Sequence, residues 1–422
     1  MFVYRLDGYY NVPAIPVGVL GFLLFVPVFW LLPGRWIRAG IITTSIAFAV
    51  LTWPIEWCAT FGLAVLYSYG VVAICQHRVR SGGTDRPPGR RWVIFVWGVV
   101  HLAYIPALVW SKFPWLPYEP VLKDRPYYWV GWLGLTCLVA RVIHVSVDLC
   151  HGKISRVRFI DYLTYVLFAP TLRIGPIMRF GELMPQLETW RDRLTPRDVG
   201  LGLARVFRGL IELGVMLFIM ENLMEHAFWG NPERFSRWVV LQTAAAAPFF
   251  LYMWMAGYAS IAVGLGRMMG IVVPENFARP WLATSIREFW KRWHITMGSW
   301  LFEYVYIPLG GNRRHVFVNY LVTFLYCAVW HGLIGSYYVW ALSQIVGLYV
   351  NRRWHLYWSG QRESETRLYD ALRRRGLVGG WFSRVLAWGL TTAYQILTLA
   401  IFMDERYSGV RWIGYLVGLY SG

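Results

Sequence analysis

Two histidines stand in apolar, aromatic surroundings between Arg287 and His331. His294 ends the run EFWKRWH, and His331 follows Trp330 inside a segment, 316–350, that carries no Asp, Glu, Lys or Arg. An ionisable side chain at membrane depth is costly to keep and usually marks a functional site. We therefore predict that this pair lines a reaction tunnel through a lipid bilayer.

The chemistry open to such a pair is proton transfer. A neutral imidazole has a pKa near working pH and can act as a general base toward a hydroxyl, which suits acyl transfer from a thioester to an alcohol. The sequence has no Gly-x-Ser-x-Gly elbow, so we favour direct transfer without an acyl-enzyme. The competing interpretation is that the two histidines are hydrogen-bonded packing residues of membrane helices. The preceding tryptophans and the basic pair Lys291 and Arg292 favour function.

The composition indicates the kind of fold that positions the two histidines. Of the 422 residues, 57% are hydrophobic, 18% aromatic and only 15% charged, against about 25% charged in ordinary soluble domains. Apolar runs of spanning length recur along the chain, and a lipid-embedded backbone satisfies its hydrogen bonds in helices. We therefore predict an all-α polytopic membrane protein. The net charge of +18 gathers in short loops, as the positive-inside rule predicts, and makes nucleic acid a poor partner.

The hydrophobic pattern predicts about ten spans, two re-entrant segments, no internal repeat and one domain, 1–422. The expected spans are about 12–32, 39–52, 57–75, 92–110, 128–149, 200–220, 238–258, 316–334, 337–350 and 381–403. The re-entrant segments are 159–176 and 294–311, the core is about 135–352, and an arginine-rich cytoplasmic loop or amphipathic helix is expected over 352–375.

The loop charges predict an orientation. Arginines 78, 80, 86, 90 and 91 stand against one acid, Asp85, and mark a cytoplasmic loop. Counting from there, His294 should lie near the cytoplasmic mouth. His331 lies roughly 22 Å along its helix from Val316, at 1.5 Å per residue, and so deeper in the membrane. A re-entrant loop can bring the two rings together.

A second polar set lies within the fifth predicted span. Arg141, His144 and Asp148 are spaced three and four residues apart, so they share one helical face. A buried, mutually paired face is the favoured interpretation, and a supporting role beside the tunnel is the alternative. The five cysteines show no CxxC spacing, so neither a disulfide framework nor a metal site is expected.

Motifs between about Leu135 and Arg352 resemble the membrane-bound O-acyltransferase family, in its bacterial branch of alginate O-acetylation proteins and teichoic acid D-alanyltransferases. In order they are Asp161-Tyr162, GPIMRF (175–180), MPQ (184–186), Gly257-Tyr258, GLG (264–266), PENF (274–277), FWKRWH (289–294), YVYIPLGGNR (304–313) and WHG (330–332).

The resemblance implies a ring-like helical core with a central tunnel that joins a cytosolic donor to an external acceptor. It assigns His331 as the general base and His294 as the second histidine. Asn276, Trp293, Trp330, Arg292 and Lys291 would position substrate along the tunnel. Two departures leave the acceptor open: Trp254 and Ser260 replace the family's aspartates, and Phe302-Glu303 replaces Arg-Asp.

We therefore expect an O-acyltransferase of the bacterial inner membrane, with no bound cofactor. It would move an acyl group, expected to be acetyl from acetyl-CoA, to a hydroxyl of an exported polysaccharide, directly or through a periplasmic acyltransferase partner. One alternative is D-alanyl transfer from a carrier-protein thioester to teichoic acid. Another, from a different class, is a transporter or lipid-handling channel in which the histidines relay protons.

Overall fold

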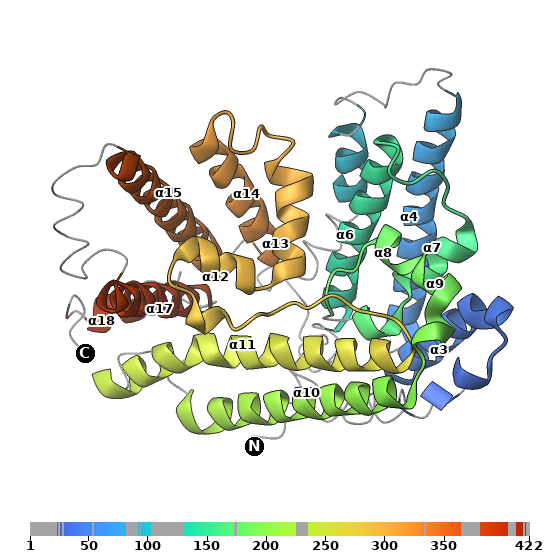
Figure 1. Cartoon of the computed structure of the whole chain (residues 1–422), viewed down its shortest axis with the longest axis horizontal. Coiled ribbons are helices and arrows are strands. Elements are labelled where there is room, and N and C mark those ends of the chain that lie inside the picture. The colour runs from blue at the N-terminus through green and yellow to red at the C-terminus, as the bar shows by residue number, and fades with distance from the viewer. Residues whose placement is uncertain are drawn as a thin grey trace, which may run out of the picture. The chain divides into compact units, whose positions relative to one another are not determined.

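The computed structural model of the chain is predominantly helical in the residues that it describes, and none of these residues forms a strand (Figure 1). These are residues 23, 26, 27, 29–52, 55–81, 92, 94–102, 130–172, 175–224, 235–332, 335–363, 380–403, 411–416 and 418. For residues 52, 56, 57, 130–135, 358–363 and 411 only the backbone is described. Several predictions lie outside the described residues: most of the first span, the loop arginines 86, 90 and 91, and the end of the fourth span.

The chain forms two compact units, Met1–Leu210 with Gly257–Pro274, and Ile211–Ala256 with Glu275–Gly422. The first contains α3 (Ile37–Thr52), α4 (Ile55–Ser81), α6 (Val130–Cys150), α7 (Phe159–Val166), α8 (Phe180–Leu183) and α9 (Gln186–Thr189). Each unit takes part of the long helices α10 (Pro196–Leu223) and α11 (Arg237–Met268).

Glycines allow α10 and α11 to approach closely within the first unit. A Cβ added to Gly202 would lie 2.8 Å from the carbonyl oxygen of Gly264, and one added to Gly264 would lie 2.6 Å from that of Gly202. Real Cβ atoms essentially never come so near. Small residues that let two helix backbones touch are typical of helix packing in membranes.

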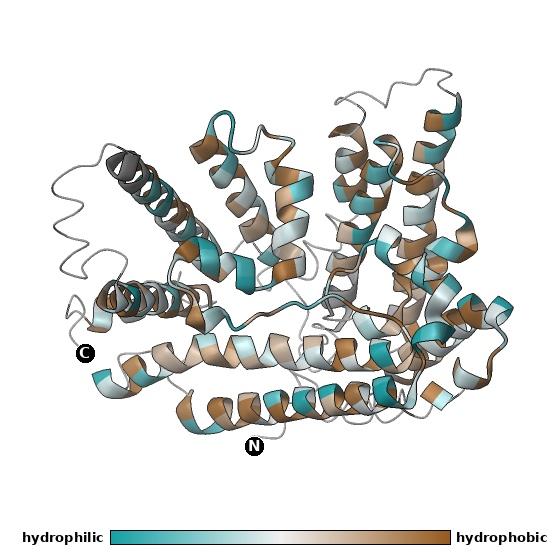
Figure 2. Cartoon of the chain, viewed as in Figure 1, coloured by the Kyte–Doolittle hydropathy of each residue, from teal (hydrophilic) through white to brown (hydrophobic). Residues whose placement is uncertain are grey.

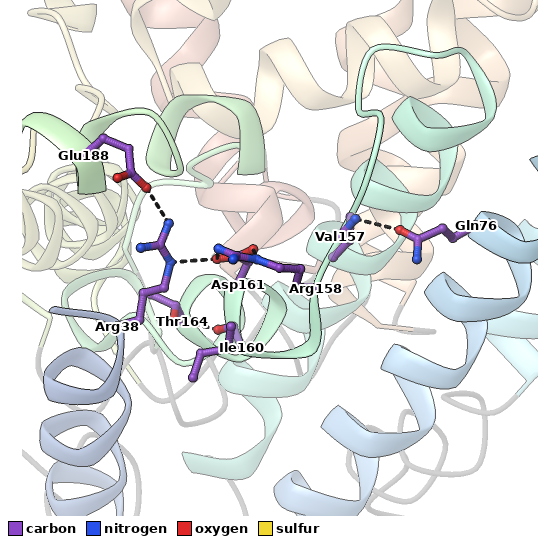
Figure 3. Close-up of polar contacts among 8 residues, drawn as sticks. All are labelled: Arg38, Gln76, Val157, Arg158, Ile160, Asp161, Thr164 and Glu188. Carbon is purple, nitrogen blue, oxygen red and sulfur yellow. Dashed lines mark hydrogen bonds and ion pairs between the residues drawn. The ribbon is translucent and has the colours of Figure 1, made fainter. Parts of the chain in front are cut away.

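An ion-pair network joins α3, α7 and α9 (Figure 3). Asp161 accepts hydrogen bonds from Arg38 at 2.7 Å and from Arg158 at 2.6 Å. Arg38 also reaches Glu188 at 2.6 Å, and nearby Gln76 accepts from the backbone N–H of Val157 at 2.6 Å. These bonds hold the irregular connection around α7, where the sequence predicts a re-entrant segment.

The second unit contains α12 (Ile286–Arg292), α13 (Ile295–Leu301), a π-helical turn (Phe302–Tyr306), α14 (Val316–His331), α15 (Gly335–Glu363), α17 (Trp381–Met403) and α18 (Arg411–Leu416). Figure 1 shows α12 to α15 as neighbours, with α14 packed along α15 and α15 against α17. The charged residues of α12 colour it largely hydrophilic in Figure 2.

Three described helices are long and apolar enough to cross a membrane: Cys58–Ser81, Arg237–Met268 and Trp381–Met403. The shorter α14 is also apolar. The predicted last span matches α17 at both ends, and the fifth matches α6 within two residues. The total of ten spans, the ring and the single domain stay predictions.

Several predicted ends are wrong in one direction: the helices continue past them. Arg78 and Arg80 lie in the last turn of α4, where a loop was expected. The expected span 238–258 runs on to Met268, and residues 352–363 continue α15 and do not begin a separate segment. Hydropathy marks the stretch that prefers an apolar environment. Helical hydrogen bonding continues beyond that stretch because nothing there breaks it.

Candidate active site

The first half of the site is built on α12, whose start is firmly capped. The hydroxyl of Ser285 accepts from the backbone N–H of Glu288 at 3.1 Å, and the Glu288 carboxylate accepts from the backbone and side chain of Thr284. The Thr284 backbone bond, with the Arg292 charge, lowers the pKa of Glu288. Together these bonds cap the helix and fix where it begins.

The last turn of α12 carries the two predicted cations. Arg292 is half-buried and its guanidinium is paired with Glu288, one turn earlier. Lys291 is exposed. Arg292 thus completes the capped helix, while Lys291 is open to an anionic group.

Asn276 holds His294 through a three-donor hydrogen-bond centre. Its side-chain oxygen Oδ1 lies 3.1 Å from His294 Nδ1, 3.2 Å from the backbone nitrogen of Thr296 and 2.9 Å from the Thr296 hydroxyl. The side chain of Asn276 is almost completely buried, at 1% exposure. Its backbone carbonyl also accepts from Ile295 at 2.9 Å, which ties the 274–278 segment to the histidine.

This centre decides the tautomer of His294. A backbone N–H can only donate, so the Thr296 bond identifies the contacted Asn276 atom as the carbonyl oxygen. His294 Nδ1 must then carry the proton that it shares with Asn276, and Nε2 of a neutral ring is left with its lone pair. Desolvation lowers the pKa of His294, which lies between two seven-residue helices and outside any membrane-spanning helix. The ring is therefore neutral at pH 7 and presents Nε2 as an acceptor.

The backbone at His294 is also unusual. Its φ of 45° is left-handed, and among the described non-glycine residues only Arg279 and His315 share that feature. Such a conformation costs roughly 1–2 kcal/mol in an L-residue. It turns the chain sharply between α12 and α13. Asn276 accepts from the backbone N–H groups of Ile295 and Thr296 after the turn, and the Ala278 N–H donates to the Arg292 carbonyl before it.

An aromatic cluster surrounds this turn. Trp293 is 4% exposed, stacks on Phe289 at 5.3 Å between ring centroids, and meets Phe277 edge-on at 5.3 Å. Phe277 in turn lies 6.3 Å from the His294 ring. Trp293 is therefore packed in the aromatic cluster at this turn and is connected to the His294 ring through Phe277.

His331 is the last residue of α14 and lies in an aromatic enclosure. Phe402 of α17 meets its ring edge-on at 4.8 Å, and Tyr337 and Trp340 of α15 lie at 5.8 and 6.1 Å. Three helix ends therefore converge on one imidazole: the C-terminal ends of α14 and α17 and the N-terminal turns of α15.

The two histidines belong to one aromatic cluster. The Trp340 ring that flanks His331 also contacts Trp290 of α12 at 5.9 Å, and Trp290 contacts Phe289, the residue stacked on Trp293. Trp290 is further fixed by a 3.0 Å hydrogen bond from its indole N–H to Gln344. The expectation that a re-entrant loop brings the two histidine rings together stays a prediction.

The remaining predicted residue, Trp330, faces a different set of partners from its neighbour His331. Its ring lies 5.8 Å from Trp300 of α13 and 6.0 Å from Tyr326. Consecutive helical residues point about 100° apart, so Trp330 packs α14 onto α13 while His331 faces α15 and α17.

The set Arg141, His144 and Asp148 is buried in the first unit and is paired only in part. His144 Nδ1 bonds Asp148 at 3.0 Å, and its Nε2 accepts from the backbone N–H of Phe180 at 2.9 Å. The expected pairing of Arg141 with this face is wrong: its guanidinium donates to the backbone carbonyls of Val166 and Thr171, each at 2.7 Å. Irregular backbone around α7 leaves carbonyls without helical partners, and Arg141 supplies the donors.

Comparison with known proteins agrees with these motifs. Residues 135–388 match the sequence model of the MBOAT, membrane-bound O-acyltransferase family. The chain belongs to this family and is an acyltransferase.

Its relatives act on cell-envelope polymers. A protein described as a probable alginate O-acetylase of Pseudomonas putida is 26% identical over 92% of this chain and 86% of its own length. The peptidoglycan O-acetyltransferase of Helicobacter pylori is 36% identical over 46% of this chain and 37% of its own length. The teichoic acid D-alanyltransferase of Bacillus subtilis is 26% identical over 67% of this chain and 76% of its own length.

Sequence reasoning missed four residues of the site: Thr296, Tyr337, Trp340 and Phe402. Thr296 stands two residues after His294 and could have been suggested as a local partner. The other three come from α15 and α17, and no spacing in the sequence relates them to His331. In the described part of the chain no group of three or more His, Cys, Asp or Glu residues could hold a metal ion.

Proposed function

We propose that this acyltransferase moves an acetyl group from a cytosolic thioester, acetyl-CoA, to a hydroxyl group of an exported polysaccharide at the inner membrane. The observation that carries the proposal is the aromatic surroundings of His331, a half-buried imidazole flanked by three aromatic rings of α15 and α17. The long alignment with the alginate O-acetylase relative supports acetyl as the group and polysaccharide as the acceptor.

In the proposed reaction His331 acts as the general base. It takes the proton of the acceptor hydroxyl while the hydroxyl oxygen attacks the thioester carbonyl carbon. A new C–O bond forms, the C–S bond breaks, and the proton passes from His331 to the departing thiolate. No acyl-enzyme is needed, because donor and acceptor meet at the same imidazole.

His294 is proposed as the positioning partner. Its Nε2 lone pair, set by the bond from Nδ1 to Asn276, can accept a hydrogen bond from a second hydroxyl of the polysaccharide, next to the one that reacts, and so hold the acceptor for attack. Trp293 packs in the aromatic cluster at the His294 turn, Trp330 packs α14 onto α13, and Arg292 pairs with Glu288 at the end of α12. Exposed Lys291 is proposed to meet the phosphates of the donor.

The test is acetyl transfer by the purified protein in lipid vesicles supplied with labelled acetyl-CoA and an acceptor polysaccharide. We expect label in the polymer with the wild-type chain and background label with His331→Ala. Covalent acylation that is unchanged in H331A would overturn the assignment of the base. Solute flux without any acylation would favour the transporter alternative. Addition of periplasmic proteins tests whether a partner completes delivery.

D-alanyl transfer is the second candidate, because the teichoic acid relative aligns over two thirds of this chain. The donor would then be a carrier-protein thioester. Supplying a D-alanyl carrier protein in place of acetyl-CoA separates the two: labelled D-alanine in the polymer, with no acetyl transfer, would replace the first proposal.

A further inference from the structure

Two buried polar groups of α15 stand next to the His331 enclosure without a partner. The hydroxyl of Ser336, whose residue is fully buried, and the indole Nε1–H of Trp340, in a residue 3% exposed, make no hydrogen bond within the described part of the chain. A buried donor left without an acceptor costs about 1–3 kcal/mol. Two such donors in adjacent turns of one helix indicate that an acceptor is supplied from outside the protein.

Another buried polar residue of this helix, Gln344, has hydrogen-bond partners within the protein. Gln344 lies one turn beyond Trp340 and is also completely buried. Its amide oxygen accepts from Trp290 at 3.0 Å, and its amide nitrogen donates to Thr398 at 2.7 Å. Packing in this region can therefore satisfy a buried polar group, and it leaves Ser336 and Trp340 unsatisfied.

Helical geometry brings these donors together beside His331. Residues four apart lie on the same face of a helix, about 5–6 Å between Cβ atoms, so Ser336 and Trp340 point the same way. The Trp340 ring stands at 88° to the His331 ring, 6.1 Å away. Tyr337, which follows Ser336 in the sequence, also contacts the His331 ring. Ser336 lies in the first turn of the 29-residue helix α15, whose N-terminal dipole favours negative charge.

We propose that Trp340 Nε1–H and the Ser336 hydroxyl form the oxyanion-binding pair of the transferase, and this inference rests on the proposed function. Their ligand is the carbonyl oxygen of the acyl thioester. When the acceptor oxygen attacks the carbonyl carbon and its proton passes to His331, negative charge develops on that carbonyl oxygen. The two donors, with the α15 dipole, stabilise the charge until the C–S bond breaks and the carbonyl re-forms.

The test compares two variants that each delete one donor and little else. Trp340→Phe keeps an aromatic ring in the enclosure and removes the indole N–H, while Ser336→Ala removes only the hydroxyl. Trp281→Phe is the matched control, because Trp281 also has a buried Nε1–H without a described partner, and its described ring contacts, Phe249, Phe289 and Trp293 among them, do not include His331. Each is assayed with the thioester that the wild-type protein uses, for kcat, for donor affinity and for melting temperature.

We expect W340F and S336A to lower kcat by roughly 10²-fold each, the size seen when one oxyanion donor is lost, with donor affinity changed less than about threefold. W281F should keep the wild-type kcat. If W340F does not fold, S336A carries the test, because it removes one oxygen atom.

A wild-type kcat in either W340F or S336A would overturn the proposal that Trp340 and Ser336 form an oxyanion-binding pair. So would an equal loss in W281F, or a kcat loss that tracks melting temperature. If the wild-type protein transfers no acyl group, the proposed function itself is overturned. If the wild-type protein is active and the variants are unaffected, only the oxyanion-binding pair is overturned.

Discussion

His144 and His294 are both packed into helical surroundings, and their hydrogen bonds distinguish a structural histidine from one that we propose to contact the substrate. His144 uses both ring nitrogens on the protein, Nδ1 toward Asp148 and Nε2 toward the backbone of Phe180. His294 uses Nδ1 on Asn276, and a neutral ring keeps a lone pair at Nε2. A base or acceptor needs a lone pair that the fold has not already used, so burial of a histidine by itself says little about function.

The surroundings differ in the same way. Around His144, Arg141 donates to backbone carbonyls and Phe180 donates to the ring, so the polar groups tie down the irregular chain near α7. Around His331 the walls are aromatic, and the polar groups nearby, Ser336 and Trp340, have no described partner. The first arrangement stabilises a fold, and the second is suited to binding a polar atom of a substrate.

Loss of the proposed base should have the largest effect. His331→Ala is expected to lower turnover by roughly 10²–10⁴-fold, the contribution typical of a general base, with little change in melting temperature. Acetyl incorporation per folded molecule measures this. His144→Gln is the contrasting variant and should retain turnover, and equal losses in the two variants would remove the distinction between the regions.

Asn276→Ala should come next, with turnover lowered by about 10²-fold because His294 loses the acceptor that fixes its tautomer and orientation. Thr296→Val removes a single donor to the same Asn276 oxygen and should cost less. Turnover measured for both variants in parallel checks the order. A larger loss of turnover in T296V than in N276A would show that the hydrogen bonds of Asn276 stabilise α13 and do not position His294.

His144→Ala should lower the free energy of unfolding by about 2 kcal/mol, since it leaves the Phe180 N–H and one Asp148 oxygen without their ring partners. Thermal unfolding in detergent measures the change. His144→Gln can restore an acceptor for the Phe180 N–H and should recover part of it. Full stability of H144A would mean that the buried face contributes nothing to the fold.

The smallest effect is expected at the ion-pair network of Figure 3. Burial opposes ionisation of Asp161, but the Arg158 and Arg38 guanidinium groups outweigh it and lower the pKa of the carboxyl. A lowered folded-state pKa gives stability that is present above the unfolded value, about 3.9, and is lost as pH falls through the folded value.

Asp161→Asn should therefore cost about 1 kcal/mol at pH 7. The difference from wild type should shrink as the pH is lowered below about 4, because protonation then removes the same charge from the wild-type carboxyl. Unfolding of both proteins across pH 3–7 tests the sign. A difference that does not depend on pH would show that packing, and not charge, accounts for the effect.

Much of the fold could be predicted because lipid imposes a simple rule on sequence. Runs of apolar residues long enough to cross a bilayer must be helical, so α17 was located to the residue and α6 within two. Helix ends were less predictable. The extensions of α4 and α15 carry charged or polar residues that hydropathy assigns to loops, whereas the backbone keeps its hydrogen bonds.

The sequence by itself determined the composition of a membrane helix bundle, the order of the family motifs and the identity of two histidines as candidates. These follow from residue types and short spacings. Only the tertiary structure decided that Asn276 sets the tautomer of His294, that Arg141 serves backbone carbonyls, and that Tyr337, Trp340 and Phe402 enclose His331. A hydrogen bond or a ring contact between separate helices depends on how those helices pack, and no local pattern in a single chain records that.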